Sequence, residues 1–267
     1  MTSGSPDPDL SSRLNTDVPH SARIWNYWLG GKDNFAADRA VGDQVKQVYP
    51  DVVEVAVASR AFLGRAVRFL AGEAGIRQFL DLGTGLPTAD NTHEVAQGIA
   101  PEAKVVYMDN DPLVLVHARA LLTSSPEGVT DYVDADVRNP DQVLRAAAKT
   151  LDFSRPIALM MLGILGNVAD SDEPGPAEIV DRFVSAVPAG SYLVINDSVL
   201  APEVVEAVQT ARSGGADYHL RTPEQIHGFF TGLDLVEPGV ISTPLWRPAP
   251  GTGPRTLNVY CGVARKP

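Results

Sequence analysis

The chain is 267 residues long, with 44% apolar and 21% charged residues and a formal net charge of −11. This length is enough for the core of one large α/β domain or of two smaller domains. The excess of carboxylates repels a phosphate backbone, so we expect no nucleic-acid partner. The single cysteine, Cys261, excludes an internal disulfide and a thiolate metal cluster.

Membrane and metal partners are not expected either. No stretch of about 18 apolar residues is available to span a bilayer. The start of the chain lacks the basic and apolar segments of a signal peptide, which predicts a cytoplasmic protein. The five histidines do not fall at metal-ligand spacing, and no metal site is expected.

The first part of the chain should differ from the rest. Residues 1–18 are rich in Ser, Pro, Asp and Gly and are expected to form a disordered arm. Residues 19–75 should form a helical extension or lid. Three helices are expected there, one running up to the Gly30-Gly31 break, one from beyond Asp33 to before Pro50, and one over residues 51–71.

Four aromatic residues surround the Gly-Gly break, and they have two interpretations. They can form a hydrophobic plug that packs the extension on the sheet, which suits Trp25 and Trp28 at least as well as any other role. They can also form a lid, because aromatic faces attract a sulfonium cation and a closed lid expels water. The sequence leaves both interpretations open.

From residue 76 onward, apolar strands alternate with helices. This pattern predicts an α/β fold with a doubly wound, mostly parallel sheet covered on both faces. Residues 76–267 contain no linker or repeat and should form one domain. Seven strands are expected, over residues 78–82, 104–109, 130–134, 157–162, 192–196, 233–237 and 257–264. Helices are expected around residues 88–98, 112–122, 140–150, 176–186 and 202–212, and after the capping-box residues Thr222 to Gln225.

The strongest functional motif, Asp-Leu-Gly-Thr-Gly, lies where the first strand ends. Gly83 and Gly85, with Thr84 between them, allow a sharp turn and a close approach to a ligand. Asp81 would oppose the pyrophosphate of a dinucleotide but suits the ammonium group of S-adenosylmethionine. Thr88 also replaces the third glycine of the dinucleotide-binding motif. The alternative is an ordinary strand-to-helix turn.

An acidic residue ends the second strand. Asp109, with Asn110 beside it, can accept hydrogen bonds from both hydroxyls of a ribose. Asp111 is better explained as the cap of the next helix. In the alternative interpretation both carboxylates are caps.

A further acidic residue follows the third strand. Asp136 suits the exocyclic amine of an adenine, with the backbone amide of Val137 facing a ring nitrogen. Asp134 competes with Asp136 for this contact, because the end of the strand is uncertain by a residue.

Taken together, these motifs resemble the class I S-adenosylmethionine-dependent methyltransferase superfamily over roughly residues 76–264. More narrowly, the stretches Trp25–Phe35, Gly85–Glu94 and Trp246–Pro248 are similar to an actinobacterial S-adenosyl methyltransferase family of largely unassigned substrate. The resemblance implies a seven-stranded Rossmann-like sheet with an antiparallel last strand. It also implies S-adenosylmethionine as cofactor and S-adenosylhomocysteine as product. Where that family often has a His after the fourth strand, this chain has Gly166-Asn167.

The sequence shows no clear catalytic base. His20, His93 and Asp197 could accept a proton, but each is expected to be structural, with His93 facing outward or capping a helix. Arg23 is a candidate partner for the cofactor carboxylate, and a surface acid is its alternative partner.

The leading hypothesis is methyl transfer to a small-molecule substrate. The alternative is a non-catalytic module that binds the cofactor for regulation or interaction; only an enzyme needs an acceptor pocket beside the methyl group. Asp81, Thr88 and the lack of a Tyr-x-x-x-Lys pair disfavour an NAD-dependent oxidoreductase. The oligomeric state is left open, a homodimer included.

Overall fold

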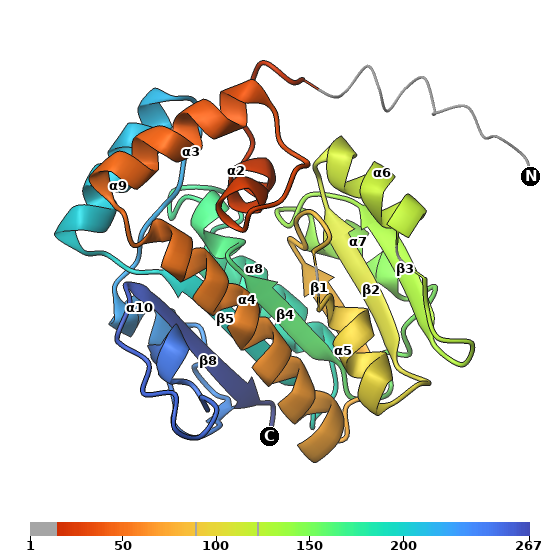
Figure 1. Cartoon of the computed structure of the whole chain (residues 1–267). Helices are drawn as coiled ribbons and strands as arrows, with labels where there is room; N and C mark the ends of the chain where they lie inside the picture. Colours follow the sequence, from red (N-terminus) through yellow and green to blue (C-terminus); the bar gives the residue numbers. More distant parts are fainter. Residues whose placement is uncertain (1–14, 89, 122) are drawn as a thin grey trace, which may run out of the picture.

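The computed structural model describes residues 15–88, 90–121 and 123–267, which form one sheet with helices on both faces (Figure 1). Most of the expected N-terminal arm, residues 1–14, lies outside the described residues. Within the described part of the chain, no helix is long and apolar enough to cross a membrane.

The strands of the sheet are β1 (Gln78–Leu82), β2 (Lys104–Asp109), β3 (Val129–Asp134), β4 (Ala158–Leu162), β5 (Tyr192–Ser198), β6 (Asp234–Leu235), β7 (Ile241–Ser242) and β8 (Val259–Arg265). Their order is β3-β2-β1-β4-β5-β8-β6, with β7 paired to β8. Strands β1 to β5 are parallel, and β8 is antiparallel to β5. The predicted α/β class and mostly parallel sheet are confirmed.

The predicted number of strands was wrong by one. The described residues contain eight strands, because Ile241 and Ser242 pair with β8 as the short strand β7. A two-residue strand is too short to produce an alternating pattern in the sequence. The sixth strand is also shorter than predicted, because the chain turns after Val236, where the Gly239 amide donates to the Val236 carbonyl oxygen at 2.9 Å.

The helices that follow the first strand are α5 (Thr92–Ile99), α6 (Pro112–Leu121), α7 (Pro140–Ala147), α8 (Pro176–Ala186), α9 (Pro202–Ser213) and α10 (Pro223–Gly228). Five of them begin with proline, which fits the first helical position because its missing N–H has no partner there. The predicted capping box is confirmed, since the Gln225 amide donates to the Thr222 hydroxyl at 3.2 Å.

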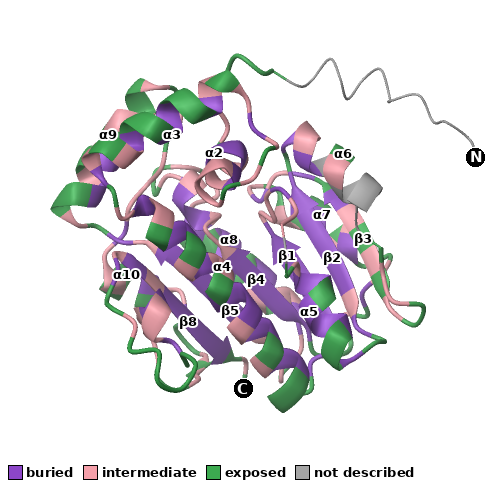
Figure 2. Ribbon diagram, in the orientation of Figure 1, coloured by how far each residue is buried: buried purple, intermediate pink, exposed green. Residues whose placement is uncertain are grey.

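Apolar side chains fill both faces of the sheet, and Figure 2 shows the central strands largely buried. Successive residues of a strand point to opposite faces. In β1, Phe79 therefore packs into the cluster beneath α4 and α5, whereas Leu80 and Leu82 pack into the cluster beneath α7, α8 and α10. Here α4 spans Val52–Arg68.

The N-terminal helices lie over one face of the sheet and over the end where the parallel strands end (Figure 1). They are α2 (Ser21–Trp28), α3 (Ala36–Val48) and α4, so the three predicted helices are confirmed. Helices α2 and α3 pack against α9 through a third apolar cluster that includes Ile24, Val45 and Val204. This arrangement places α2 above the predicted ligand-binding edge of the sheet, whereas α4 runs along one face of the sheet and α3 lies beside α9.

Candidate functional site

A cavity of about 460 Å³ lies at the carboxyl ends of β1, β2 and β4, between the sheet and the N-terminal helices. This volume is within the range of small-molecule sites. Every predicted cofactor residue except Arg23 lines it, namely Asp81, Gly83, Thr84, Gly85, Asp109, Asn110, Asp136 and Val137. Motifs from three strands meet in one space because the carboxyl ends of parallel strands share one edge.

Asp81 is only 4% exposed and accepts a hydrogen bond from the Thr92 hydroxyl at 2.6 Å. Burial raises the pKa of its carboxyl to about 6, and the positive charge of Arg60 opposes part of that rise. The carboxylate is therefore ionised at neutral pH in a poorly solvated position. A cationic ligand group beside Asp81 would stabilise this charge.

The glycine turn after β1 brings backbone to the cavity wall. Gly83 and Gly85 have φ values of 73° and 67°, which favour glycine. The Gly83 amide donates to the Met108 carbonyl oxygen at 2.9 Å, which ties the turn to β2. A Cβ atom on Gly83 would come within 2.6 Å of Ile164, so the close approach to the loop after β4 requires glycine.

Asp109 holds this turn from the end of β2. Its Oδ2 accepts a hydrogen bond from the Gly85 amide at 2.8 Å, and its Oδ1 accepts one from the Asp111 amide at 2.9 Å. Burial raises the pKa of Asp109, and these two amides oppose the rise. The remaining lone pairs can accept ligand hydroxyls. Asp111 caps α6, as predicted, by accepting from the Leu113 amide at 2.9 Å.

The structure separates the two candidates after β3. Asp136 lines the cavity, whereas Asp134 is exposed and is not one of its lining residues. The Asp136 carboxylate accepts a hydrogen bond from Asn110 at 3.3 Å and forms an ion pair with Arg138 at 3.1 Å. Only the Asp136 alternative therefore reaches the cavity.

Arg23 has a different partner from either of those expected. Its Nε and Nη2 atoms each donate to Asp111 at 3.0 Å, and Nη1 donates to the Asn15 carbonyl oxygen at 2.9 Å. Arg23 is 3% and Asp111 1% exposed. Because the inner face of α2 covers the end of β2, the guanidinium meets a buried acid of the chain itself. Arg23 anchors α2 and is not a lining residue of the cavity.

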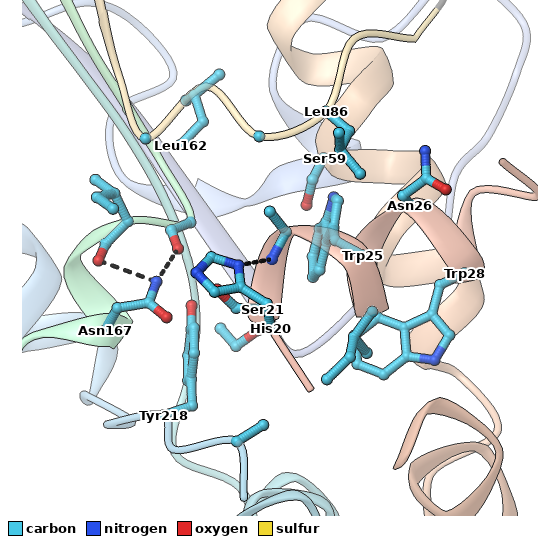
Figure 3. Close-up of a pocket in the computed structure, with 18 of the residues that line it drawn as sticks. His20, Ser21, Trp25, Asn26, Trp28, Ser59, Leu86, Leu162, Asn167 and Tyr218 are labelled. Atoms are coloured by element: carbon cyan, nitrogen blue, oxygen red, sulfur yellow. Dashed lines mark hydrogen bonds between the residues drawn. The ribbon is translucent and has the colours of Figure 1, made fainter. Parts of the chain in front are cut away.

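Two residues of α4 that carry no sequence motif also line the cavity. Arg60 donates to Asn91 Oδ1 at 3.0 Å and lies close enough to Asp81 to affect its pKa. Ser59 is 7% exposed, and among the described residues its hydroxyl has no hydrogen-bond partner (Figure 3). A buried hydroxyl without a partner costs free energy that a polar ligand can recover.

Trp25 and Trp28 form part of the cavity wall on α2 (Figure 3). Their rings meet edge to face with centroids 5.8 Å apart, and Trp28 Nε1 donates to the Gly42 carbonyl oxygen at 3.2 Å. Both rings also pack against the apolar cluster of α2, α3 and α9. The two tryptophans therefore have the packing role expected of a plug, from a position beside the site.

A second polar region of the cavity lies after β4 and before α10. Asn167 and Tyr218 line it, and the Tyr218 hydroxyl donates to the buried Asp197 behind it. We call these three residues the polar corner. Sequence reasoning identified Asp197 as a weak candidate base but did not identify Tyr218, because no motif links the two positions.

The histidines occupy two different environments. His20 lines the cavity, with its Nδ1 3.2 Å from Asp111 Oδ2. His93 is 2% exposed, and its Nδ1 lies 2.8 Å from the Tyr107 hydroxyl. The prediction that His93 faces outward was wrong, because the first turn of α5 packs on β2. Among the described residues, no group of three or more His, Cys, Asp and Glu could hold a metal ion.

These features fit a nucleoside with an amino-acid tail. One cavity is surrounded by acidic residues at the ends of β1 and β2, by another after β3 and by a glycine turn. The Ser59 hydroxyl, which has no partner in the described part of the chain, also lines it. Together with the strand order and antiparallel β8, they define a class I methyltransferase fold and site.

The chain belongs to the S-adenosyl methyltransferase family, whose model matches residues 7–267. It is therefore an S-adenosylmethionine-dependent methyltransferase. A DUF574 family protein from Streptomyces avermitilis is 43% identical, with a TM-score of 0.90 over 94% of this chain and 99% of that one. A candidate methyltransferase from Thermobifida fusca is 42% identical, with a TM-score of 0.87 over 98% of both chains.

More distant structures share only the fold. Magnesium protoporphyrin IX methyltransferase from Synechocystis, with bound S-adenosylmethionine, is 12% identical, with a TM-score of 0.53 over 100% of both chains. None of the curated proteins compared with the chain matches it.

Proposed function

We propose that the protein methylates a small molecule with a largely apolar skeleton. The observation that carries this proposal is the extent of the cavity, which continues beyond the cofactor residues into an apolar end. The walls of that end come from α3, α4, α9 and the segment before α10, and include Val41, Val45, Val52, Val204, Ala207 and Leu220. A non-catalytic cofactor-binding module has no need of this second compartment.

The lining residues suggest how the cofactor is held. We assign Asp81 to the ammonium group, Asp109 with Asn110 to the ribose, and Asp136 with the Val137 amide to the adenine. Gly83, Thr84 and Gly85 provide the backbone that approaches the cofactor. When bound, S-adenosylmethionine supplies an activated methyl group on a sulfonium.

The cofactor carboxylate needs a cationic partner other than Arg23. Arg60 and Ser59 lie on adjacent positions of α4 and both line the cavity. Arg60 also lies near Asp81, which we assign to the ammonium group of the same amino acid. We therefore assign Arg60 and the Ser59 hydroxyl to the carboxylate.

The N-terminal helices complete the site. Residues 19–75, as a helical extension to the methyltransferase domain of residues 76–267, would exclude water and position the acceptor. The acidic net charge of −11 supports a small-molecule acceptor rather than nucleic acid, and we expect the enzyme to act in the cytoplasm.

The test has two stages. Isothermal titration should show binding of S-adenosylmethionine and S-adenosylhomocysteine but not of NAD. The protein is then incubated with a cell extract and methyl-labelled S-adenosylmethionine, and label is expected in the small-molecule fraction. Cofactor binding without any label transfer would support the non-catalytic module, and label confined to protein or nucleic acid would refute a small-molecule acceptor.

A further inference from the structure

The polar corner presents only hydrogen-bond acceptors to a ligand. Asn167 Nδ2 donates to the carbonyl oxygens of Gly163 at 3.1 Å and Ile164 at 3.3 Å, the two dashed lines beside Asn167 in Figure 3. The carboxamide must have this orientation, since its oxygen in that place would face two other oxygens. Asn167 Oδ1 is therefore left to accept a hydrogen bond.

Tyr218 is polarised in the same sense. When Asp197 is ionised it has no proton to give, so the Tyr218 hydroxyl donates its proton to Asp197 and keeps its lone pairs for the cavity. Asp197 is 4% exposed and also accepts from the backbone amides of Ser198 and Gly166. Burial raises the pKa of Asp197 to about 7, and the charge of Arg221 opposes the rise.

Asn167 and Tyr218 are neighbours in space. A Cβ atom on Gly166 would lie 2.0 Å from Tyr218 Cζ, so the tyrosine ring occupies the place of a side chain on the residue next to Asn167. The His219 amide donates to the Gly166 carbonyl oxygen at 2.7 Å. Arg221 donates to two further carbonyl oxygens of the same turn, at 2.9 and 2.7 Å. Hydrogen bonds from His219 and Arg221 thus tie the segment that carries Tyr218 to the turn that carries Asn167.

We propose that this corner binds the N–H groups of an amine, which makes the methyl acceptor a primary amine with an apolar skeleton. A primary amine offers at least two N–H donors for the two acceptor atoms, whereas an alcohol offers one and a carboxylate none. The negative charge of Asp197 also favours an amine over a carboxylate, and the neutral amine is the form that reacts. This inference rests on the proposed function, because it names the acceptor class of the same site.

The corner also provides a route for the proton that the reaction releases. The amine lone pair forms the new bond to the methyl carbon, whose bond to sulfur breaks with the electron pair retained by sulfur. The nitrogen then carries one surplus proton. Tyr218 accepts this proton and transfers its own to Asp197, which later releases it to solvent. The products are the methylated amine and S-adenosylhomocysteine, and Tyr218 ends neutral.

Three probes with one carbon skeleton test the assignment. Phenethylamine, phenethyl alcohol and phenylacetate are titrated by calorimetry into the protein saturated with S-adenosylhomocysteine, at about pH 8, where Asp197 is ionised. We expect the amine to bind about tenfold more tightly than the alcohol, and phenylacetate not to bind detectably. Transfer of label from methyl-labelled S-adenosylmethionine should follow the same order.

A pair of matched variants shows whether the corner causes this preference. Tyr218→Phe keeps the ring on Gly166 and removes the hydroxyl, and it should lower phenethylamine affinity about tenfold without changing S-adenosylhomocysteine affinity. Tyr27→Phe removes a hydroxyl that donates to Asp43 Oδ1 at 2.6 Å. Tyr27 does not line the cavity, so this variant should change neither affinity.

Each outcome decides between the two proposals. Equal or tighter binding of the alcohol or the acid, no binding of any probe, or an unchanged amine affinity in Tyr218→Phe overturns the amine assignment. If the amine assignment fails but S-adenosylhomocysteine binds and label still reaches small molecules in the extract, the proposed function stands without the amine assignment. If the cofactor does not bind at all, the proposed function itself fails.

Discussion

The two ends of the cavity are built in different ways. At the cofactor end, Asp81 and Asp109 lie on adjacent strands within a short stretch of the chain, and one glycine turn connects them. At the acceptor end, the polar corner combines the turn after β4, the end of β5 and the segment before α10, under helices from the N-terminal extension. The centre of the first end is therefore formed by one short stretch of the chain, to which α4 and the segment after β3 add single residues, whereas the second end is assembled from distant segments.

This difference explains how one fold can serve many acceptors. The cofactor end depends mainly on backbone atoms and strand ends, with Ser59 and Arg60 of α4 added, and the strand ends change little without loss of the sheet itself. The acceptor end depends on side chains of loops and added helices, which can vary while the sheet persists. Four predictions test the anchor of α2 and the cofactor end, from the largest expected effect to the smallest, and the variants of the acceptor end described above complete the comparison.

Removal of the anchor between α2 and β2 should have the largest effect, on stability. Arg23→Met leaves the Asp111 carboxylate buried without its guanidinium partner and should lower the free energy of unfolding by about 3–5 kcal/mol. Denaturant titration measures this change. Arg182→Met, which breaks the exposed pair with Asp141 at 2.6 Å, should cost less than about 1 kcal/mol. Similar losses in both variants would contradict the anchoring role.

At the cofactor end, Asp109→Ala should weaken S-adenosylhomocysteine binding by about 1.5–3 kcal/mol. The variant loses the ribose contact and also the acceptor of the Gly85 amide. Calorimetry measures the affinity, and Asp134→Ala, one strand away and outside the cavity lining, is the control. An unchanged affinity in Asp109→Ala would mean that the ribose lies elsewhere.

Cofactor affinity should also depend on pH through Asp81. Its carboxyl has a pKa raised to about 6 by burial, so it is ionised above that pH and protonated below it. Affinity for S-adenosylmethionine should therefore fall as the pH drops through 6, by roughly tenfold one unit below the pKa. Asp81→Asn should bind weakly at every pH and lose this dependence. A wild-type profile that is flat between pH 5 and about 7 would exclude the pairing of Asp81 with the ammonium group.

The smallest expected effect has opposite signs for stability and binding. Ser59→Ala removes a buried hydroxyl that has no partner among the described residues, so the free protein should be unchanged or up to about 1 kcal/mol more stable. The same variant should bind S-adenosylhomocysteine up to about tenfold more weakly. Ser213→Ala, at an exposed position of α9, is the control for the effect of a serine-to-alanine change on the stability of a helix. Loss of stability without loss of affinity would argue that Ser59 only packs.

The same contrast determines which site residues can be predicted from the sequence. The strand-end acids and the glycine turn were placed correctly at the cavity, since a strand followed by a glycine turn and a helix fixes where its last side chains lie. The choice of Asp136 over Asp134 depended on one residue of strand length. The sequence pattern could not resolve that length, whereas the fold does.

The remaining site residues depend on tertiary packing. Nothing in the sequence around Arg23 indicates that it is buried. Its burial against Asp111 results from the packing of α2 across the end of β2. Ser59 and Arg60 interrupt an apolar helix without forming a motif. Tyr218 reaches the cavity because Gly166 has no side chain. The two residues lie on different loops, so no local sequence motif predicts this contact.

The Arg23–Asp111 pair has a consequence for the rates of cofactor exchange. It joins the helix above the cavity to the segment that follows Asp109, so a movement of α2 away from this segment requires a buried charged pair to separate. If the pair is intact both before and after the cofactor binds, it leaves the equilibrium affinity unchanged and slows entry and departure equally. For a cofactor that passes α2, the spent nucleoside would then have a long residence time, which can make product release the slow step of turnover.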